Sequence, residues 1–172
     1  VHGNGTNSTI KGVLGNWYNS NLSGYASKIA TGGGATFCND RTPSSGSGTG
    51  TTDYAAYTRL VDNKAPSLKC TDSGDRFATA VGLITADEVA YAGGVYNTNN
   101  FGYYLYTSKS YWTMSPSFSD NSNAYVFPVY SGGKLAFNRV NYMYGVRPVI
   151  SLKADTQFSS GNGTISNPYT VS

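Results

Sequence analysis

Two cysteines are the residues whose chemistry the sequence predicts most directly. Cys38 and Cys70 enclose 31 residues (positions 39–69), and neither belongs to a Cys-x-x-Cys motif. The single histidine, His2, lies at a terminus, so a metal site built from Cys and His is not expected. The simplest interpretation is a disulfide, which would contribute about 3–4 kcal/mol by restricting the unfolded chain; two buried free thiols are the alternative. A disulfide would place the protein outside the reducing cytosol.

Two groups of acidic residues could bind a cation or transfer protons. Asp87 and Glu88 are adjacent, and neighbouring side chains on a helix point apart, so joint catalysis is not expected. Glu88 is explained by a capping box that begins at Thr85. Asp72-Ser73-Gly74-Asp75 is too sparse for a calcium-binding loop and predicts a solvated turn.

The sequence lacks the residues that a serine nucleophile and a phosphate-binding loop require. Ser115 precedes Pro116 and has no Gly-x-Ser-x-Gly context, and no internal histidine could act as its base. Gly32-Gly33-Gly34 is not followed by Lys-Ser/Thr, so it does not predict a phosphate-binding loop. We therefore expect no catalytic residue, no cofactor and no resident metal, and a function that is not enzymatic.

Side chains suited to recognition concentrate between 117 and 144. Tyr, Asn, Ser, Phe and Gly dominate this run; tyrosines give rigid contact area at low entropic cost, and small polar residues adapt their hydrogen bonds. Strand alternation requires that part of the run faces the core, since Ala124, Val126, Leu135 and Val140 need buried neighbours. Position along the chain alone does not separate the two groups.

Apolar spacing and turn residues predict helices in the first half of the chain. Apolar residues from Ile10 to Tyr18 recur at helical spacing within a helical signal over 8–29. A second helix covers 85–92, where the capping box begins it and Gly93-Gly94 ends it. A short helical stretch is expected between them, over 53–61.

The second half of the chain predicts strands. Strands are expected over 103–107, 111–114, 124–130, 134–140 and 146–152. Ser131-Gly132-Gly133 predicts a hairpin turn, and Pro148 predicts an edge or a bulge in the last strand. The segments 31–35 and 43–52 are expected to be loops, and the tail 159–172 to end in a short strand or a wrap. Helices followed by antiparallel strands indicate an α+β fold.

Composition favours one extracellular or surface-exposed domain over residues 1–172. Charged residues make up 12% of the chain, about half of the roughly 25% that soluble domains carry. The basic residues are scattered at a net charge of +3, so no stripe for nucleic acid is present. No apolar run approaches the ~20 residues that span a bilayer. The chain opens without Met or a signal peptide, so a mature fragment or an excised domain is expected.

Three segments, in order, resemble the C-terminal half of C-type-lectin-like domains. They are Tyr-Trp-Thr-Met-Ser-Pro from Tyr111, the aromatic and Asn-rich hairpin with its Gly-Gly turn, and Gly-Val-Arg-Pro-Val from Gly145. The chain is most similar to bacterial variable proteins diversified by retroelements and to related surface domains of gut Firmicutes. The resemblance is closest over 111–152 and extends more loosely over 10–171. It implies a C-type-lectin-like fold, with two helices followed by a twisted antiparallel sheet with long loops.

In that family a constant scaffold displays variable side chains on its late strands and loops. The resemblance implies a ligand-binding face over about 117–144, made of Phe118, Asn121, Asn123, Tyr125, Phe127, Tyr130, Lys134, Phe137, Asn138, Arg139, Asn141, Tyr142 and Tyr144. It matches Trp112, Gly145 and Arg147 to the scaffold. Apolar neighbours also favour a buried, paired Arg147 over a ligand anchor.

Two kinds of activity known from this fold lack their motifs here. The Glu-Pro-Asn, Gln-Pro-Asp and Trp-Asn-Asp motifs of calcium-dependent sugar-binding lectins are absent from the sequence, so calcium-mediated sugar binding is not expected. No cysteine follows Cys70, so the chemistry of formylglycine-generating relatives is not expected either.

The leading hypothesis is a non-enzymatic domain on a cell or phage surface that binds a protein or glycan ligand on another surface. Diversification by a retroelement is part of what the resemblance implies. Tyr125, Phe127, Tyr130 and Tyr142 are expected to supply most of the affinity. The alternative is a structural head domain of a pilin-like or filament subunit, joined to its neighbours by the same aromatic surface. An oxygenase or hydrolase is disfavoured because His and clustered acids are lacking.

Overall fold

The computed structural model describes residues 6–32, 35–164 and 166–172. Its helical elements are α1 (Thr9–Asn21), η1 (Ser23–Tyr25), α2 (Ala55–Tyr57), the π-helix η3 (Thr58–Asp62), η4 (Ser73–Asp75) and α3 (Ala86–Tyr91). Its strands are β1 (Thr36–Cys38), β2 (Pro43–Ser45), β3 (Thr52–Tyr54), β4 (Arg76–Ala78), β5 (Gly82–Leu83), β6 (Tyr111–Ser119), β7 (Ala124–Val129), β8 (Asn138–Arg139), β9 (Pro148–Val149), β10 (Phe158–Ser160) and β11 (Thr170–Val171). His2 and part of the expected loop 31–35 lie outside the described residues.

The helix α1 is shorter than the predicted 8–29. It begins after Ser8, as expected, but ends at Asn21. Near its end the side chain of Asn21 donates to the Trp17 carbonyl at 2.8 Å, and Ser23 donates to the Asn19 carbonyl at 2.7 Å. The Ser23 bond occupies the Asn19 carbonyl, which the backbone N–H of residue 23 would use if the helix continued, so polar side chains compete with the helix here. Downstream, Ile29 is buried in a β-bridge and not in a helix.

The capping box that begins α3 is confirmed. The Glu88 backbone N–H donates to the Thr85 hydroxyl at 3.1 Å, and the Glu88 carboxylate accepts from the Thr85 backbone N–H at 2.7 Å. The helix ends where Gly93 adopts a φ of +114°, a conformation that a side chain would oppose.

A five-stranded antiparallel sheet has the order β2-β3-β6-β7-β8. Its first strand, β2, lies in the predicted loop 43–52, and β3 begins at the end of that loop and takes the first two residues of the helical stretch expected over 53–61, so both predictions are wrong at these positions. The missed signal is the alternation in β3, where Thr52 and Tyr54 are buried and Asp53 is only partly buried. The strands β1–β5 are interleaved with the helices, so the predicted order of helices first and sheet second is also wrong. The α+β class is confirmed.

The predicted turn at Ser131-Gly132-Gly133 is confirmed. The Gly133 N–H donates to the Tyr130 carbonyl at 2.7 Å, and the Tyr130 N–H donates to the Lys134 carbonyl at 2.9 Å. Gly133 has a φ of +78°, and a Cβ at this position would lie 1.9 Å from the Asn100 carbonyl oxygen. Only glycine therefore fits this turn.

Three predicted strands are absent or much shorter. The segment 103–107 forms no strand, because Tyr103 is drawn into the core beside Gly93 and Gly133. The expected strand 134–140 is reduced to β8, and 146–152 is reduced to β9, which pairs with β5 at an edge. The edge position of Pro148 agrees with its missing N–H.

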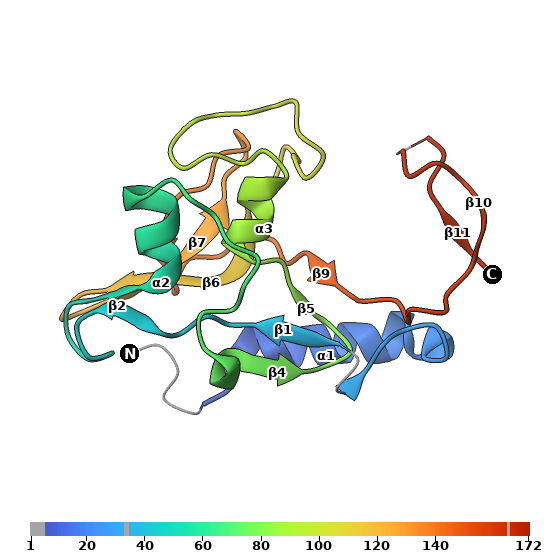
Figure 1. Ribbon diagram of the computed structural model, residues 1–172, viewed down its shortest axis with the longest axis horizontal. Helices are drawn as coiled ribbons and strands as arrows, with labels where there is room; N and C mark the ends of the chain where they lie inside the picture. The colour runs from blue at the N-terminus through green and yellow to red at the C-terminus, as the bar shows by residue number, and fades with distance from the viewer. Residues whose placement is uncertain (1–5, 33–34, 165) are drawn as a thin grey trace.

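The sheet has a separate core on each face. Figure 1 shows α2 and α3 beside β6 and β7, and α1 behind β1 and β4. The core beneath α2, η3 and α3 contains Ala56, Leu60, Ala86, Val89, Tyr103, Tyr111, Phe127, Val129 and Leu135. The core beneath α1 contains Leu14, Val81, Leu83 and Trp112, with Ile10, Tyr18, Met114, Val126, Tyr144 and Ile150 packed against it. Side chains of the same strands β6 and β7 thus enter two separate interiors.

The tail forms the hairpin β10–β11, which stands away from the body of the molecule (Figure 1). Its two strands pair only with each other, and their residues are exposed. The rings of Phe158 and Tyr169 pack together with centroids 4.9 Å apart.

Candidate ligand-binding surface

The predicted recognition face is divided between the two sides of the sheet. On the α2 side, Phe118 stacks on Tyr125 with ring centroids 4.1 Å apart and meets the Phe137 ring edge-on at 5.0 Å. Tyr57 of α2 and Tyr96 pack against these rings. All five, which we call the Phe118 cluster, are half-buried.

An irregularity in strand pairing places Phe118 in this cluster. In a regular strand, Phe118 would share a face with Trp112 and Met114. The register between β6 and β7 shifts between Pro116 and Ser119. A one-residue bulge transfers the following side chains to the opposite face, which is how Phe118 comes to stack on Tyr125.

On the α1 side, Trp112, Tyr130, Tyr142 and Tyr144 form a second group, the Trp112 cluster. Tyr144 lies at its centre, with ring centroids 4.7 Å from Trp112, 5.8 Å from Tyr130 and 6.4 Å from Tyr142. The Asn138 amide donates to the Tyr130 hydroxyl at 3.1 Å and to the Tyr144 hydroxyl at 2.6 Å. Burial, with the neighbouring Tyr144 adding to it, raises the pKa of Tyr130 to about 12.

Burial separates the predicted contact residues into three groups. The exposed residues are Asn121, Arg139, Asn141 and Tyr142. The half-buried residues are Phe118, Asn123, Tyr125, Tyr130, Lys134, Phe137, Asn138 and Tyr144. Phe127 is fully buried in the α2-side core at 0% exposure, so its prediction as a contact residue is wrong. It alternates with the half-buried Val126 along β7, and its side of the strand faces α2 and α3.

Exposed apolar side chains gather in the β8–β9 loop (residues 140–147). Met143 is 95% exposed, Val140 53% and Tyr142 52%. Met143 was not predicted as a contact residue because nothing in its local sequence distinguishes it from a core methionine. On the same side of the sheet, α1 exposes Val13 and Trp17 beside its buried residue Leu14.

Two adjoining hollows form a groove beside α1, which we call the α1 groove. Their volumes are about 330 Å³ and about 460 Å³. Both contain the apolar side chains of Ile10, Leu83 and Met114, and both have Asn39 and Arg41 among their polar lining. The larger hollow extends past Trp112 and Val126 to Val140, so the groove reaches the β8–β9 loop. Its residues come from segments far apart in the sequence, which is why sequence reasoning missed it.

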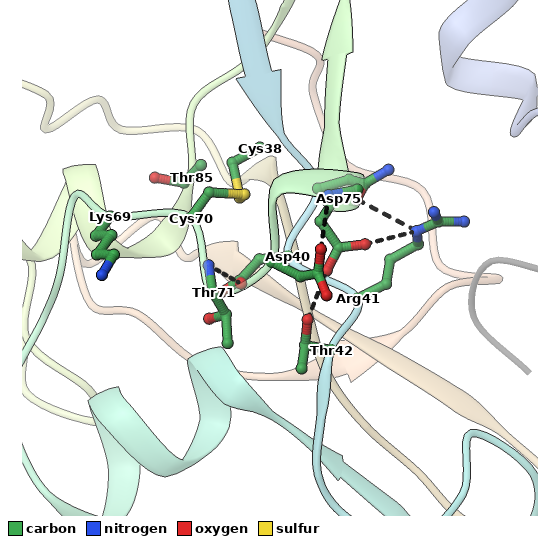
Figure 2. The surroundings of a disulfide bond; sticks show 12 residues. Cys38, Asp40, Arg41, Thr42, Lys69, Cys70, Thr71, Asp75 and Thr85 are labelled. Carbon is green, nitrogen blue, oxygen red and sulfur yellow. Dashed lines mark hydrogen bonds and ion pairs between the residues drawn. A yellow bond between two sulfur atoms is a disulfide. The ribbon is translucent and has the colours of Figure 1, made fainter.

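The predicted disulfide is present between Cys38 and Cys70, whose Cα atoms are 5.7 Å apart, so the alternative of two free thiols is wrong. Beside it, the segments 38–42 and 70–75 are joined by side chains that face each other (Figure 2). Asp75 accepts from Arg41 at 3.3 Å and from the Thr42 hydroxyl at 2.9 Å. The first of these bonds holds Arg41 in place at the groove, and the Asn39 N–H donates to the Asp75 carbonyl at 3.0 Å.

Arg59 links two buried carboxylates next to the disulfide. It donates to both oxygens of Asp87 at 2.8 and 2.7 Å and also contacts Asp40. Burial lowers the pKa of Arg59, but hydrogen bonds to Asp87 and Asp40 outweigh it, and the net direction is upward. Asp87 also accepts from the Ser67 backbone N–H at 2.8 Å. With its acceptors occupied in this way, Asp87 has a structural role that the sequence did not reveal.

The 72–75 segment is only partly the solvated turn that was predicted. Asp72 is exposed and caps the turn by accepting from the Gly74 N–H at 2.7 Å, whereas Asp75 is buried and paired with Arg41. Among the described residues, one group of potential metal ligands lies within 4.8 Å: Cys38, Asp40 and Cys70. Both of its sulfur atoms belong to the disulfide, so neither is a thiolate ligand in this state.

Arg147, the last residue of the β8–β9 loop, contacts the scaffold. Its guanidinium donates to the Leu105 carbonyl at 2.7 Å and lies over the Tyr111 ring at 5.4 Å from the centroid. It is half-buried, and its hydrogen-bond partner is a carbonyl. These contacts tie the 103–107 segment to β6.

Comparison of the chain with protein-family models, with curated proteins and with solved structures finds no match. Within the described part of the chain, the helices are too short or too polar to cross a bilayer. The functional conclusion therefore depends on the geometry of the chain itself.

Proposed function

We propose that this chain is a non-enzymatic recognition domain that binds a ligand through the α1 groove and the β8–β9 loop. The observation that carries the proposal is the group of exposed apolar residues in the β8–β9 loop, with Met143 at 95% exposure, in a loop whose residue Val140 lines the groove. Soluble proteins rarely leave large apolar patches in water unless a partner covers them. The disulfide is compatible with display outside the cytosol.

The chemistry of this surface favours a protein ligand over a glycan. Tyr, Trp, Met and Arg are the residues enriched at protein interfaces, and Trp17, Arg139, Tyr142 and Met143 supply one of each. Methionine adapts its shape to different apolar partners. The groove beside the loop has an apolar floor with polar groups at Asn39 and Arg41, which suits a segment of polypeptide with one or two apolar side chains.

We further propose that the fold is C-type-lectin-like and that the loop surface belongs to a variable face. Helices on a twisted antiparallel sheet and a late hairpin that leads to an exposed loop support this reading. Genomic sequence tests the diversification. A near-identical template repeat beside a reverse-transcriptase gene, with differences confined to codons of the 117–144 face, is expected; a single invariant copy without such a gene would contradict it.

Binding can be tested with two libraries and one pair of matched variants. The purified chain is screened against displayed linear peptides and against an array of defined oligosaccharides. We expect peptide binders that are lost in Tyr142→Ser with Met143→Ser, because these side chains are exposed and contribute little to folding. Tyr104→Ser is the control, since Tyr104 is 76% exposed and does not line the groove.

Three outcomes separate the possibilities. Loss of binding in the Tyr142 and Met143 variant, with the control unaffected, supports the proposal. Hits on the oligosaccharide array alone would replace the protein ligand by a glycan. Peptide binding that is retained in the Tyr142→Ser with Met143→Ser variant would contradict the proposed surface.

A second function is favoured by the hairpin β10–β11. It stands off the body and exposes Phe158 and Tyr169, and an isolated two-stranded hairpin is only marginally stable in water. A structural head domain of a filament subunit would use such a hairpin to contact the next subunit. Sedimentation of a concentration series decides this: association that Phe158→Ser abolishes supports it, and a monodisperse monomer contradicts it.

A further inference from the structure

A small apolar pocket lies on the α2 side of the sheet, apart from the α1 groove. Its volume is about 250 Å³. The lining residues come from four segments of the chain: Leu60, Val61, Lys64, Pro66, Ala90, Gly94, Val95, Tyr96 and Leu135. Apart from Lys64 and the Tyr96 hydroxyl, the lining side chains are apolar.

The walls of this pocket are held in place by specific contacts. The π-helix η3 supplies Leu60 and Val61, and π-helical turns occur frequently at functional sites. The Tyr91 hydroxyl donates to the Pro66 carbonyl at 2.9 Å, which fastens the 64–66 segment to α3. The Leu135 N–H donates to the Val95 carbonyl at 3.1 Å and joins the opposite wall. The pocket is therefore formed before any ligand arrives.

Lys64 is the only charged residue among those that line the pocket, and its backbone conformation is unusual. Its backbone has a φ of +52°, a left-handed conformation that non-glycine residues seldom adopt. The flanking bonds from the Asn63 N–H to the Thr58 carbonyl at 2.9 Å and from the Ala65 N–H to the Arg59 carbonyl at 2.8 Å hold it there. None of the ion pairs among the described residues includes Lys64, and Asp62, the nearest acid in sequence, does not line the pocket.

The size and charge of the pocket define a ligand class. A cavity of about 150 Å³ holds one benzene ring, so a somewhat larger one takes a single aromatic or branched group with a short chain. It is below the roughly 300 Å³ at which sites for larger ligands begin. Lys64 lines the pocket and is exposed, so its ammonium can pair with an anion on that chain. Val95, which lines the pocket and is 52% exposed, adds apolar surface that solvent can reach.

We propose that this pocket binds an aromatic or branched apolar group that carries a carboxylate, with the apolar group between Leu60, Val95 and Leu135 and the carboxylate at Lys64. The carboxylate could belong to a free aromatic acid or to the C-terminal residue of a polypeptide, since both present the same chemistry. This site is independent of the α1 groove and of the function proposed there.

Amide chemical-shift mapping of the whole chain with four probes tests the proposal. The small probes are 3-phenylpropionate and its neutral amide; the peptide probes are Gly-Gly-Phe with a free and with an amidated C-terminus. Both acids should shift the amides of Ala90, Val95 and Tyr96. The neutral partners should bind about two- to fivefold more weakly, as expected for one exposed charge pair. Tighter binding of the tripeptide indicates a polypeptide end, and tighter binding of the small acid indicates a free metabolite.

Two variants separate charge from shape. Lys64→Gln should remove the difference between acid and amide and leave the amide affinity unchanged. Ala90→Leu should fill the cavity and stop both from binding; Val95→Tyr, on the exposed rim, is the second blocking variant if Ala90→Leu unfolds. Four results would each overturn the proposal. They are equal affinity for acid and amide in the unmodified chain, shifts confined to the α1 groove, binding that survives both blocking variants, and no shifts at millimolar probe concentration.

Discussion

At the residue scale, Phe127 and Tyr142 show that burial, and not residue type, decides whether an aromatic side chain stabilises the core or is free to contact a ligand. Both are aromatic residues of the 117–144 run, but Phe127 is fully buried and Tyr142 is 52% exposed. We expect Phe127→Ala to lower the free energy of unfolding by about 3–5 kcal/mol, and Tyr142→Ala to change it by no more than about 0.5 kcal/mol. Urea denaturation followed by tryptophan fluorescence measures both. Similar losses in the two variants would show that Tyr142 belongs to the core.

The contacts of Arg59 with Asp40 and Asp87 lead to a second prediction at this scale. Asp87→Asn keeps the size of the side chain but leaves Arg59 with one fewer negative partner in a mostly buried site. Disrupting such a pair should cost about 3–5 kcal/mol of unfolding free energy. The matched control is Asp72→Asn, because Asp72 is an exposed cap and Asn caps equally well. If the two variants lose the same stability, the network is not a significant source of stability.

The raised pKa of Tyr130 predicts that the stability of the fold depends on pH in the alkaline range. Its pKa is raised from 10.0 to about 12, chiefly by burial. Between these values the unfolded chain loses the phenolic proton while the folded chain keeps it, so this contribution is complete below about pH 10 and disappears as the pH rises through about 12. The free energy of unfolding should therefore fall over this range, and less steeply in Tyr130→Phe. Denaturant titrations at a series of pH values, with Tyr104→Phe as control, measure the slopes; identical slopes for Tyr130→Phe and the unmodified chain would contradict this.

At the scale of elements, local signals predict the ends of elements better than their pairing. The capping box at Thr85 and Glu88 and the turn at Gly133 could both be read from the sequence, because their causes lie within a few neighbouring residues. The strands β2 and β3 could not, since each has only three residues and β3 depends on the distant strand β6 for its place in the sheet. The strand expected over 103–107 was wrong because Tyr103 packs into the core across Gly93 and Gly133.

The capping box itself can be tested quantitatively. Thr85→Ala removes the acceptor of the Glu88 N–H and should cost about 0.5–2 kcal/mol of unfolding free energy. Thr85→Ser retains a hydroxyl at the same position and should recover most of the loss. Urea denaturation of the three proteins gives the comparison. A Ser variant as unstable as the Ala variant would mean that the Thr85 methyl group, and not the cap, stabilises α3.

At the scale of the whole molecule, the sheet separates two surfaces with different chemistry. The α2 side holds the Phe118 cluster and the small pocket with Lys64, and the α1 side holds the Trp112 cluster, the groove and the exposed loop. Composition indicated that aromatic and amide side chains serve recognition, but not which of them share a face. That division depends on the bulge between Pro116 and Ser119, and the groove depends on segments near positions 10, 40, 83 and 140 that only the fold brings together.

The measurement that tests the proposed recognition surface most directly is chemical-shift mapping of the labelled chain with the tightest peptide from the display screen. We predict shifts concentrated at Ile10, Asn39, Met114 and the 140–144 segment, and a loss of affinity of at least about tenfold in Tyr142→Ser with Met143→Ser, in the range of an interface hot spot. Shifts centred on the Phe118 cluster or on the hairpin β10–β11, with full affinity in that variant, would contradict the account.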